Sequence, residues 1–174
     1  CLLRTSPPPL RTSPGRARGI GRCPKWNVAA RNTSELGIKQ FDSIVLLIRE
    51  MLIAGVDHAN VWAVQQNNDT KLIANTGLKD DPFGGLTFAG LAFDMLSTHV
   101  RGLQVVLHSG SIEGLATAAF GSDKRVVYFL SNKTDAGRTD SLLLSALPSG
   151  SHHLTIYQIE ENAAGSPSVA ITSL

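Results

Sequence analysis

The spacing of hydrophobic positions changes once along the chain, near Gly102. Before that glycine, apolar residues recur every three or four positions over 36–54 and 88–100, which predicts two amphipathic helices. Between them, 60–65 is apolar on both faces at its centre, as a buried parallel strand would be. The order helix, strand, loop, helix predicts an α/β arrangement.

Local signals support the ends of both predicted helices. Asn32, followed three residues later by Glu35, forms an Asn-led capping box before the first helix, and Gly55 is placed to end it. Thr87 is placed to cap the second helix, and Gly102 to end it. The loop 66–85 is long for a connection between a strand and a helix, which is typical of functional or mobile loops.

After Gly102 the apolar residues alternate or form short runs, which is typical of β-structure. Six strands are predicted, at 103–107, 115–120, 125–130, 141–144, 154–159 and 168–172. Short strands at close spacing without helices favour an antiparallel sheet or a small sandwich. The predicted fold class is therefore α/β followed by all-β.

Composition separates residues 1–25 from the rest. They hold five of the eight prolines, both cysteines, six of the 16 Lys and Arg, and no acid. We expect a disordered Pro- and Arg-rich tail, a composition that can also bind an SH3-like partner. The rest carries ten cations against 14 acids, so no nucleic-acid partner is predicted. No apolar run approaches the roughly 18 residues of a membrane span, and no signal-peptide layout begins the chain, which we expect to be processed or incomplete.

Four motifs carry a resemblance to a known family: Trp26-Asn27-Val28, AGVDHANVWAVQ, GLTFAGLAFDMLSTHVRG and AAFGSDKRVVYFLSNKT. Together they resemble the end of a (β/α)8-barrel glycoside hydrolase with an appended β-sandwich. Within the third motif, Phe88 stands where the family commonly has Pro. The chain looks most like secreted bacterial proteins of the type I export class, although their calcium-binding glycine–aspartate repeats are absent.

The resemblance implies a terminal piece of a (β/α)8 barrel, at 26–102, packed on an antiparallel β-sandwich-like domain at 103–174. Active sites of such barrels lie at the C-terminal ends of the strands. The implied substrate-binding candidates are therefore Trp26, Asn27, Trp62, Gln65 and Gln66. An indole face stacks on the C–H surface of a pyranose, and amides fix its hydroxyls. Trp62 equally suits a residue that fills the core, so both interpretations stay open.

The catalytic carboxylates of these enzymes have no counterpart in the chain. The family nucleophile is usually a Glu just before the Trp-Asn pair, where this sequence has Lys25. The flank 19–24 is too polar to be the preceding barrel strand, and the acid/base of the family lies in earlier barrel units. Because retaining enzymes need two carboxylates, we assign no catalytic residue and expect the chain alone not to hydrolyse glycosides.

No motif predicts a metal or a cofactor. His152 and His153 are consecutive, so they face opposite sides of a strand. The Asp-rich loop lacks the ligand spacing of a calcium-binding loop. An intact enzyme with unfamiliar chemistry would need two carboxylates near Trp62, for which Glu113 and Asp69 are the candidates.

Two functional hypotheses follow. The first is a C-terminal remnant of a glycoside hydrolase-like protein, with carbohydrate, a missing barrel portion or a partner chain as its binding partner. The second is a non-catalytic module that binds carbohydrate or protein. A remnant should expose a large apolar face on the strand at 60–65 and on both helices, whereas a module should cover those faces with its own sheet. An extracellular location is implied by the resemblance alone.

Overall fold

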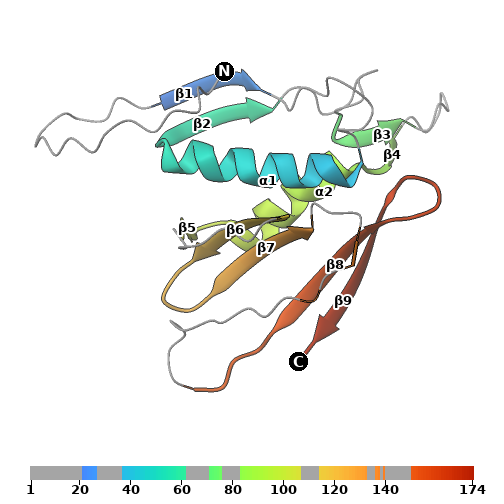
Figure 1. Cartoon of the computed structure of the whole chain (residues 1–174). Helices are drawn as coiled ribbons and strands as arrows, with labels where there is room; N and C mark the ends of the chain where they lie inside the picture. The colour runs from blue at the N-terminus through green and yellow to red at the C-terminus, as the bar shows by residue number, and fades with distance from the viewer. Residues whose placement is uncertain are drawn as a thin grey trace, which may run out of the picture.

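The computed structural model describes residues 21–26, 37–61, 71–75, 83–106, 114–132, 136–137, 139 and 150–174. Over these ranges the chain forms two α-helices, one short π-helix and nine strands, so most of its regular structure is β. The strands belong to four small sheets, three of them two-stranded and one three-stranded. Figure 1 shows the sheets on both sides of the longer helix.

The first three elements form a β-α-β unit. Strands β1 (Gly21–Trp26) and β2 (Val56–Val61) pair in parallel, and helix α1 (Ile38–Ile53) connects them and lies along one side of the pair (Figure 1). Parallel strands need such a crossover because the first strand ends at one end of the sheet and the second begins at the opposite end. The predicted strand at 60–65 overlaps β2 at Asn60, which is exposed, and Val61, which is partly buried; residues 62–65 lie outside the described residues.

Helix α1 confirms the predicted periodicity. Its buried apolar side chains are Phe41, Ile44, Val45 and Met51, which lie on adjoining turns of one face. Gly55 follows the helix with φ +73°, a left-handed conformation that glycine adopts without strain.

The N-terminal residue of α1 differs from the predicted cap. The helix is preceded by Gly37, and among the described residues no side chain caps it. The predicted capping box at Asn32 and Glu35 lies outside the described residues.

The second helix follows a short hairpin. Strands β3 (Ile73–Asn75) and β4 (Phe83–Leu86) pair antiparallel and lead into α2 (Phe88–Met95). The N–H of Gly90 donates to the hydroxyl of Thr87 at 3.1 Å, which confirms the predicted cap. The prediction of one long loop over 66–85 is wrong at β3 and at the start of β4, because strands of three and four residues are too short to show an alternating pattern.

The core lies between the helices and a three-stranded sheet. A π-helix, η2 (Leu96–Val100), continues α2, and the sheet runs β5 (Gln104–Val105), β6 (Leu115–Gly121), β7 (Val126–Asn132). Phe120 of β6 is fully buried, and the ring of Phe129 packs edge-on against it at 5.9 Å. The same Phe129 lies 6.1 Å from Phe41 of α1, so aromatic contacts join sheet to helix. We call α1, α2, η2 and β5–β7 the body.

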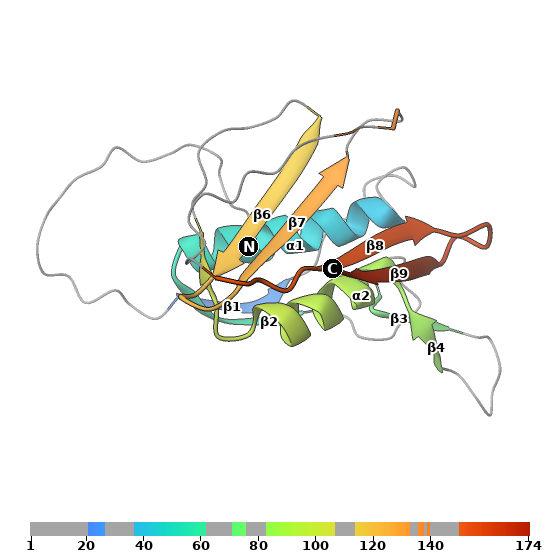
Figure 2. The same cartoon turned by 90° about the horizontal axis from the view of Figure 1, so that it is seen from below.

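The last two strands form a separate hairpin. Strands β8 (Thr155–Glu161) and β9 (Pro167–Ser173) pair antiparallel along their full length. Figures 1 and 2 show this hairpin beside the body; in Figure 1 its turn lies near the N-terminal end of α1, and the end that carries the C-terminus points away from the helix. Five of the six predicted strands after Gly102 are therefore present within a few residues, and the sixth, 141–144, lies outside the described residues.

The predicted fold, a terminal piece of a (β/α)8 barrel packed on an antiparallel β-sandwich-like domain, is wrong. The described residues contain one parallel strand pair, and it does not close into a barrel. The antiparallel strands form separate sheets of three strands and two strands. Spacing locates each element, but barrel closure depends on strands that lie far apart in sequence and that no local motif encodes.

The predicted disordered tail also needs correction at its end. Residues 21–25, assigned to the tail, belong to β1, which includes part of the flank 19–24 that was considered too polar for a barrel strand. Their pairing with β2 supplies the backbone hydrogen bonds of a strand without requiring an apolar sequence. Residues 1–20 lie outside the described residues.

Candidate functional site

The carboxyl ends of β1 and β2 are the first candidate, because the predicted carbohydrate-binding residues follow them. Trp26, the last residue of β1, pairs with Val61, the last of β2. The backbone therefore brings the two carboxyl ends together at one edge, where α/β proteins commonly bind ligands. The other candidates, Asn27, Trp62, Gln65 and Gln66, lie outside the described residues, and so does the side chain of Trp26.

A buried polar pair links α1 to β7. Asp42 is 8% exposed, and its carboxylate accepts a hydrogen bond from the hydroxyl of Ser131 at 2.5 Å. The bond joins residues 89 positions apart and satisfies a carboxylate that burial would otherwise destabilise. We assign it a structural role, because it joins two elements of the body and the Asp42 side chain is buried.

The β8–β9 hairpin is the second candidate, because much of the exposed apolar surface belongs to it. Side chains alternate between its faces, and directly paired residues share a face. The inner face carries the pairs Tyr157–Ile171 and Ile159–Val169, and the outer face carries Ile156 paired with Thr172. Exposed large apolar side chains occur on both faces: Leu154, Ile156, Tyr157, Val169, Ile171 and Leu174.

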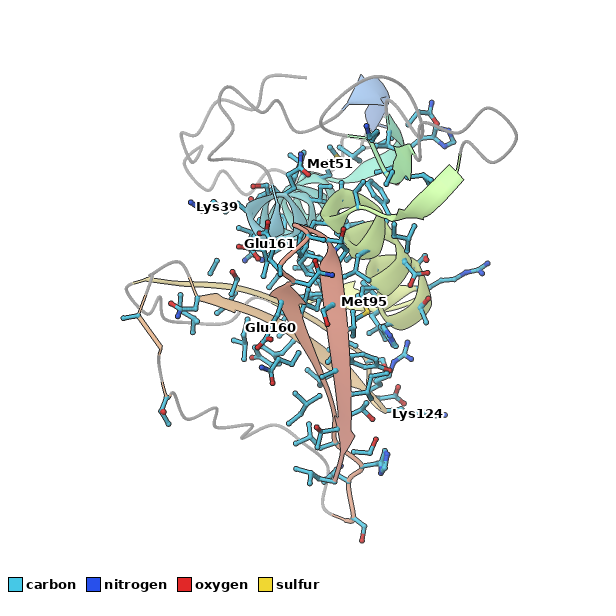
Figure 3. All side chains as sticks on the ribbon, turned by 90° about the vertical axis from the view of Figure 1, so that its right-hand side faces the viewer. Lys39, Met51, Met95, Lys124, Glu160 and Glu161 are labelled. Carbon is cyan, nitrogen blue, oxygen red and sulfur yellow. The ribbon has the colours of Figure 1, made fainter. Side chains whose placement is uncertain are left out.

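Within the part of the chain that the structure describes, the inner face touches the body at a few points. The ring of Tyr157 lies 4.7 Å from that of His99 in η2, and Ile159 packs against the core. A Cβ added at Gly37 would lie 2.7 Å from a carboxylate oxygen of Glu161, so this side chain lies against the start of α1. Figure 3, seen along α1 from its N-terminal end, shows Glu161 beside the helix and Glu160 lower on the hairpin.

The outer face faces away from these contacts. Leu154 and Leu174 lie opposite each other, joined by reciprocal backbone hydrogen bonds of 3.1 and 2.9 Å, and Ile156 follows on the same face. The exposed fractions of Leu154, Ile156 and Leu174 are 49%, 44% and 72%. Apolar side chains this exposed contribute little free energy to folding, and several of them on one face are typical of a contact surface.

The hydrogen-bond pattern shows which backbone groups of the hairpin are turned outward. Leu154 bonds Leu174, and the N–H of Asn162 donates to the carbonyl of Ser166 at 3.0 Å. Because hydrogen-bonded pairs recur at every second position of an antiparallel ladder, even-numbered residues of β8 face β9. The N–H and C=O groups of Thr155, Tyr157 and Ile159 are therefore directed to the other edge of β8.

The end of the hairpin is a fixed turn. The side-chain oxygen of Asn162 accepts hydrogen bonds from the N–H groups of Ala164 and Ser166, at 2.9 and 3.0 Å. Gly165 adopts φ +74° within the turn. These bonds hold the register of β8 against β9, so the outward backbone groups have a defined spacing.

Within the described ranges, no group of three or more His, Cys, Asp or Glu side chains could hold a metal ion. The same ranges contain no helix that is long and apolar enough to cross a membrane. Glu113 and Asp69, the carboxylates considered for an unfamiliar enzyme, lie outside the described residues.

The chain matches no family model, no curated protein and no solved structure in the three comparisons made. The resemblance to glycoside hydrolases therefore stays a prediction. The hairpin was missed as a candidate site because alternation predicts a strand without showing whether a second layer covers it. One signal was available: 154–159 and 168–172 are apolar on both faces, whereas a strand with one face in solvent usually alternates apolar and polar residues.

Proposed function

We propose that this chain is a non-catalytic interaction module that contacts another protein through the β8–β9 hairpin. The observation that carries the proposal is the exposed apolar surface of the hairpin, on strands whose outward backbone groups bond no other residue that the structure describes. Edge strands and exposed apolar patches are the features through which sheets recruit further chains.

The covering of the helices favours a module over a remnant. The apolar faces of α1 and α2 lie against each other and against β6, where Ile44, Ala92 and Phe120 are buried. On β2 the exposed stretch 57–60 is mainly polar, with Asp57, His58 and Asn60. Among the described residues, six of the twelve exposed large apolar side chains belong to the hairpin segment 154–174. The other six are spread over α1, β4, β7 and the residue after β5: Leu52, Ile53, Leu86, Val106, Val126 and Leu130.

Site-specific photocrosslinking tests the proposal. The photoreactive amino acid benzoylphenylalanine replaces Ile156 in one variant and Leu52 of α1 in a matched control, since their exposed fractions are 44% and 45%. Irradiation of cells that produce each variant, followed by mass spectrometry of the adducts, should give protein adducts from position 156 only. No adduct from position 156, or equal adducts from both positions, would contradict a contact through the hairpin.

Carbohydrate binding at the carboxyl ends of β1 and β2 is a second candidate. The pairing of Trp26 with Val61 favours it, because the chain continues from Val61 directly into Trp62. An indole face stacks on the C–H surface of a pyranose ring, so Trp26 and Trp62 are the residues that this candidate would use.

Tryptophan fluorescence tests this candidate, because Trp26 and Trp62 are the two tryptophans of the chain. Titration with pyranose oligosaccharides should shift the emission, and Trp26→Phe should weaken binding about tenfold or more, as loss of a stacking anchor does. Trp26→Phe with unchanged affinity would place any sugar elsewhere, and an emission that no oligosaccharide shifts would argue against the candidate.

A further inference from the structure

The hairpin segment 150–174 combines exposed apolar side chains with an unbalanced charge. It contains two carboxylates, Glu160 and Glu161, and no Lys or Arg. Both glutamates are exposed (Figure 3), and among the described residues no Lys or Arg forms an ion pair with either. Glu160 accepts a hydrogen bond from the side chain of Gln158 at 2.5 Å, but that amide is neutral and leaves the carboxylate its charge. A segment that complements the hairpin should therefore be both apolar and cationic.

The apolar and acidic side chains share the outer face of the hairpin. Leu154, Ile156 and Glu160 are an even number of positions apart along β8 and the residue before it, so they lie on one face. Leu174, opposite Leu154, extends the apolar end. The six positions from Leu154 to Glu160 span about 20 Å along a strand. The face thus has an apolar end and an acidic end within the length of a short extended peptide.

The N-terminal segment 1–20 of the same chain has the matching composition. It carries four Arg, three Leu, four Pro and no acid, and the sequence Leu-Arg-Thr-Ser-Pro occurs in it twice, at 3–7 and 10–14. Every other segment outside the described residues that is longer than one residue contains an Asp or a Glu. The N-terminal segment is therefore the one whose apolar and cationic side chains complement the hairpin.

The structure sets the distance that this segment has to cross. Gly21, which follows it, pairs with Val56 just after the C-terminal end of α1. Glu161 lies against Gly37, at the N-terminal end of the same helix. Because the 16 residues of α1 span about 24 Å, the acidic end of the hairpin lies about that far along the helix from Gly21.

This distance selects the first half of the segment. The ten residues from Arg11 to Gly21 span up to about 33 Å when extended, which is sufficient. The spans from Arg16 and Arg18 to Gly21 are at most about 17 and 10 Å, which is too short. Since the chain arrives at the acidic end first, Arg11 lies beside the carboxylate and Leu3 extends to the apolar end. The eight positions between them span about 25 Å as polyproline II, enough for the length of the face.

We propose that residues 2–11 fold back on their own chain and cover the outer face of the β8–β9 hairpin. Arg11 lies beside Glu160, and Leu3 packs on Leu154 and Leu174. This inference rests on the proposed function, because the segment competes with the partner protein for the same surface. The contact is intrachain, so its occupancy does not depend on protein concentration, and a partner has to displace it.

Photocrosslinking of the purified full chain tests the contact. Benzoylphenylalanine at position 156 should crosslink within one chain to a peptide from residues 2–11, with the same yield at all protein concentrations. Leu86 of β4 is the matched control position, since the exposed fractions of Ile156 and Leu86 are 44% and 42%, and it should give no such link. Benzoylphenylalanine in place of Leu3 is the reciprocal variant, which leaves the hairpin unchanged and should crosslink to 154–174.

Charge reversal tests the register with a matched control. Arg4→Glu together with Arg11→Glu should lower the crosslink yield about three- to tenfold, because attraction to Glu160 becomes repulsion. Arg16→Glu together with Arg18→Glu makes the same change of charge and should lower the yield less than about twofold. Adding Glu160→Lys to the first pair should restore the yield, because the signs are then exchanged across the contact.

The outcomes separate this inference from the proposed function. A position 156 that links to another segment, only to a second copy or to nothing overturns the intrachain contact, and so do equal losses from the two charge-reversed pairs. In cells, reversal at Arg4 and Arg11 should raise the yield of protein adducts from position 156 about threefold or more. If another protein is captured there but the purified chain forms no link to 2–11, the proposed function stands and this inference falls. If the link forms but neither chain captures a protein in cells, the proposed function fails and the intrachain contact stands.

Discussion

The body and the β8–β9 hairpin are built from similar strands but differ in what covers them. Strand β6 carries the buried Phe120 and Ala118 on the side that packs against α1, whereas β8 has one half-buried residue, Ile159. Both have paired antiparallel neighbours, so backbone hydrogen bonding does not distinguish them. The difference shows that side chains packed from a second layer determine which strands form a core and which stay available for contact.

Truncation of one apolar side chain in each region should show the largest contrast. Phe120→Ala should lower the free energy of unfolding by about 3–5 kcal/mol, because it removes a fully buried ring that contacts Phe129. Ile171→Ala on β9 should change it by less than about 0.5 kcal/mol, because this side chain is 62% exposed. Urea denaturation followed by circular dichroism measures both, and similar costs would mean that the hairpin contributes to the core.

Glycine substitutions sharpen the contrast within the body. Gly90 packs so closely that an added Cβ would lie 2.0 Å from the carbonyl oxygen of Leu72. Gly90→Ala should therefore cost about 1–3 kcal/mol through displacement of the backbone at 71–72. Gly85→Ala is the matched control, since a Cβ there meets nothing within 4 Å. Equal midpoints of thermal unfolding for the two variants would contradict this close packing.

A smaller effect is expected from the polar link between α1 and β7. Ser131→Ala removes the hydroxyl that donates to the buried carboxylate of Asp42 and should cost about 1–2 kcal/mol. Ser97→Ala, whose exposed hydroxyl donates to the carbonyl of Asp94, is the control and should be nearly neutral. Chemical denaturation of both variants checks this, and a neutral Ser131→Ala would show that the bond does not contribute to stability.

The sequence predicted most elements because their signals are local. Apolar spacing placed α1 to within two residues of its observed ends, and Thr87 was identified as the cap that it proved to be. Positive φ angles at Gly55 and Gly102 confirm both as residues that end a helix. Each of these features depends on residues a few positions apart, which a sequence shows directly.

The remaining features depend on contacts between distant residues. The bond from Ser131 to Asp42 spans 89 positions, and nothing near Asp42 indicates that a mid-helix carboxylate is buried. The pairing of β1 with β2 was likewise missed, because it joins residues about 35 positions apart and the sequence of 21–26 shows no apolar strand pattern. The sequence of β8 and β9 is apolar on both faces, which indicates contacts on both sides but does not show whether those contacts lie within the chain, so their exposure was missed.

Residue-resolved hydrogen exchange tests most directly whether the hairpin differs from the core. The amides of Ala118 and Phe120 should exchange slowly, because they lie in the core. The outward amides of Thr155, Tyr157 and Ile159 should exchange much faster, because they bond no other described residue. Outward β8 amides protected as strongly as those of Ala118 and Phe120 would contradict the account, since the hairpin would then be covered like the core.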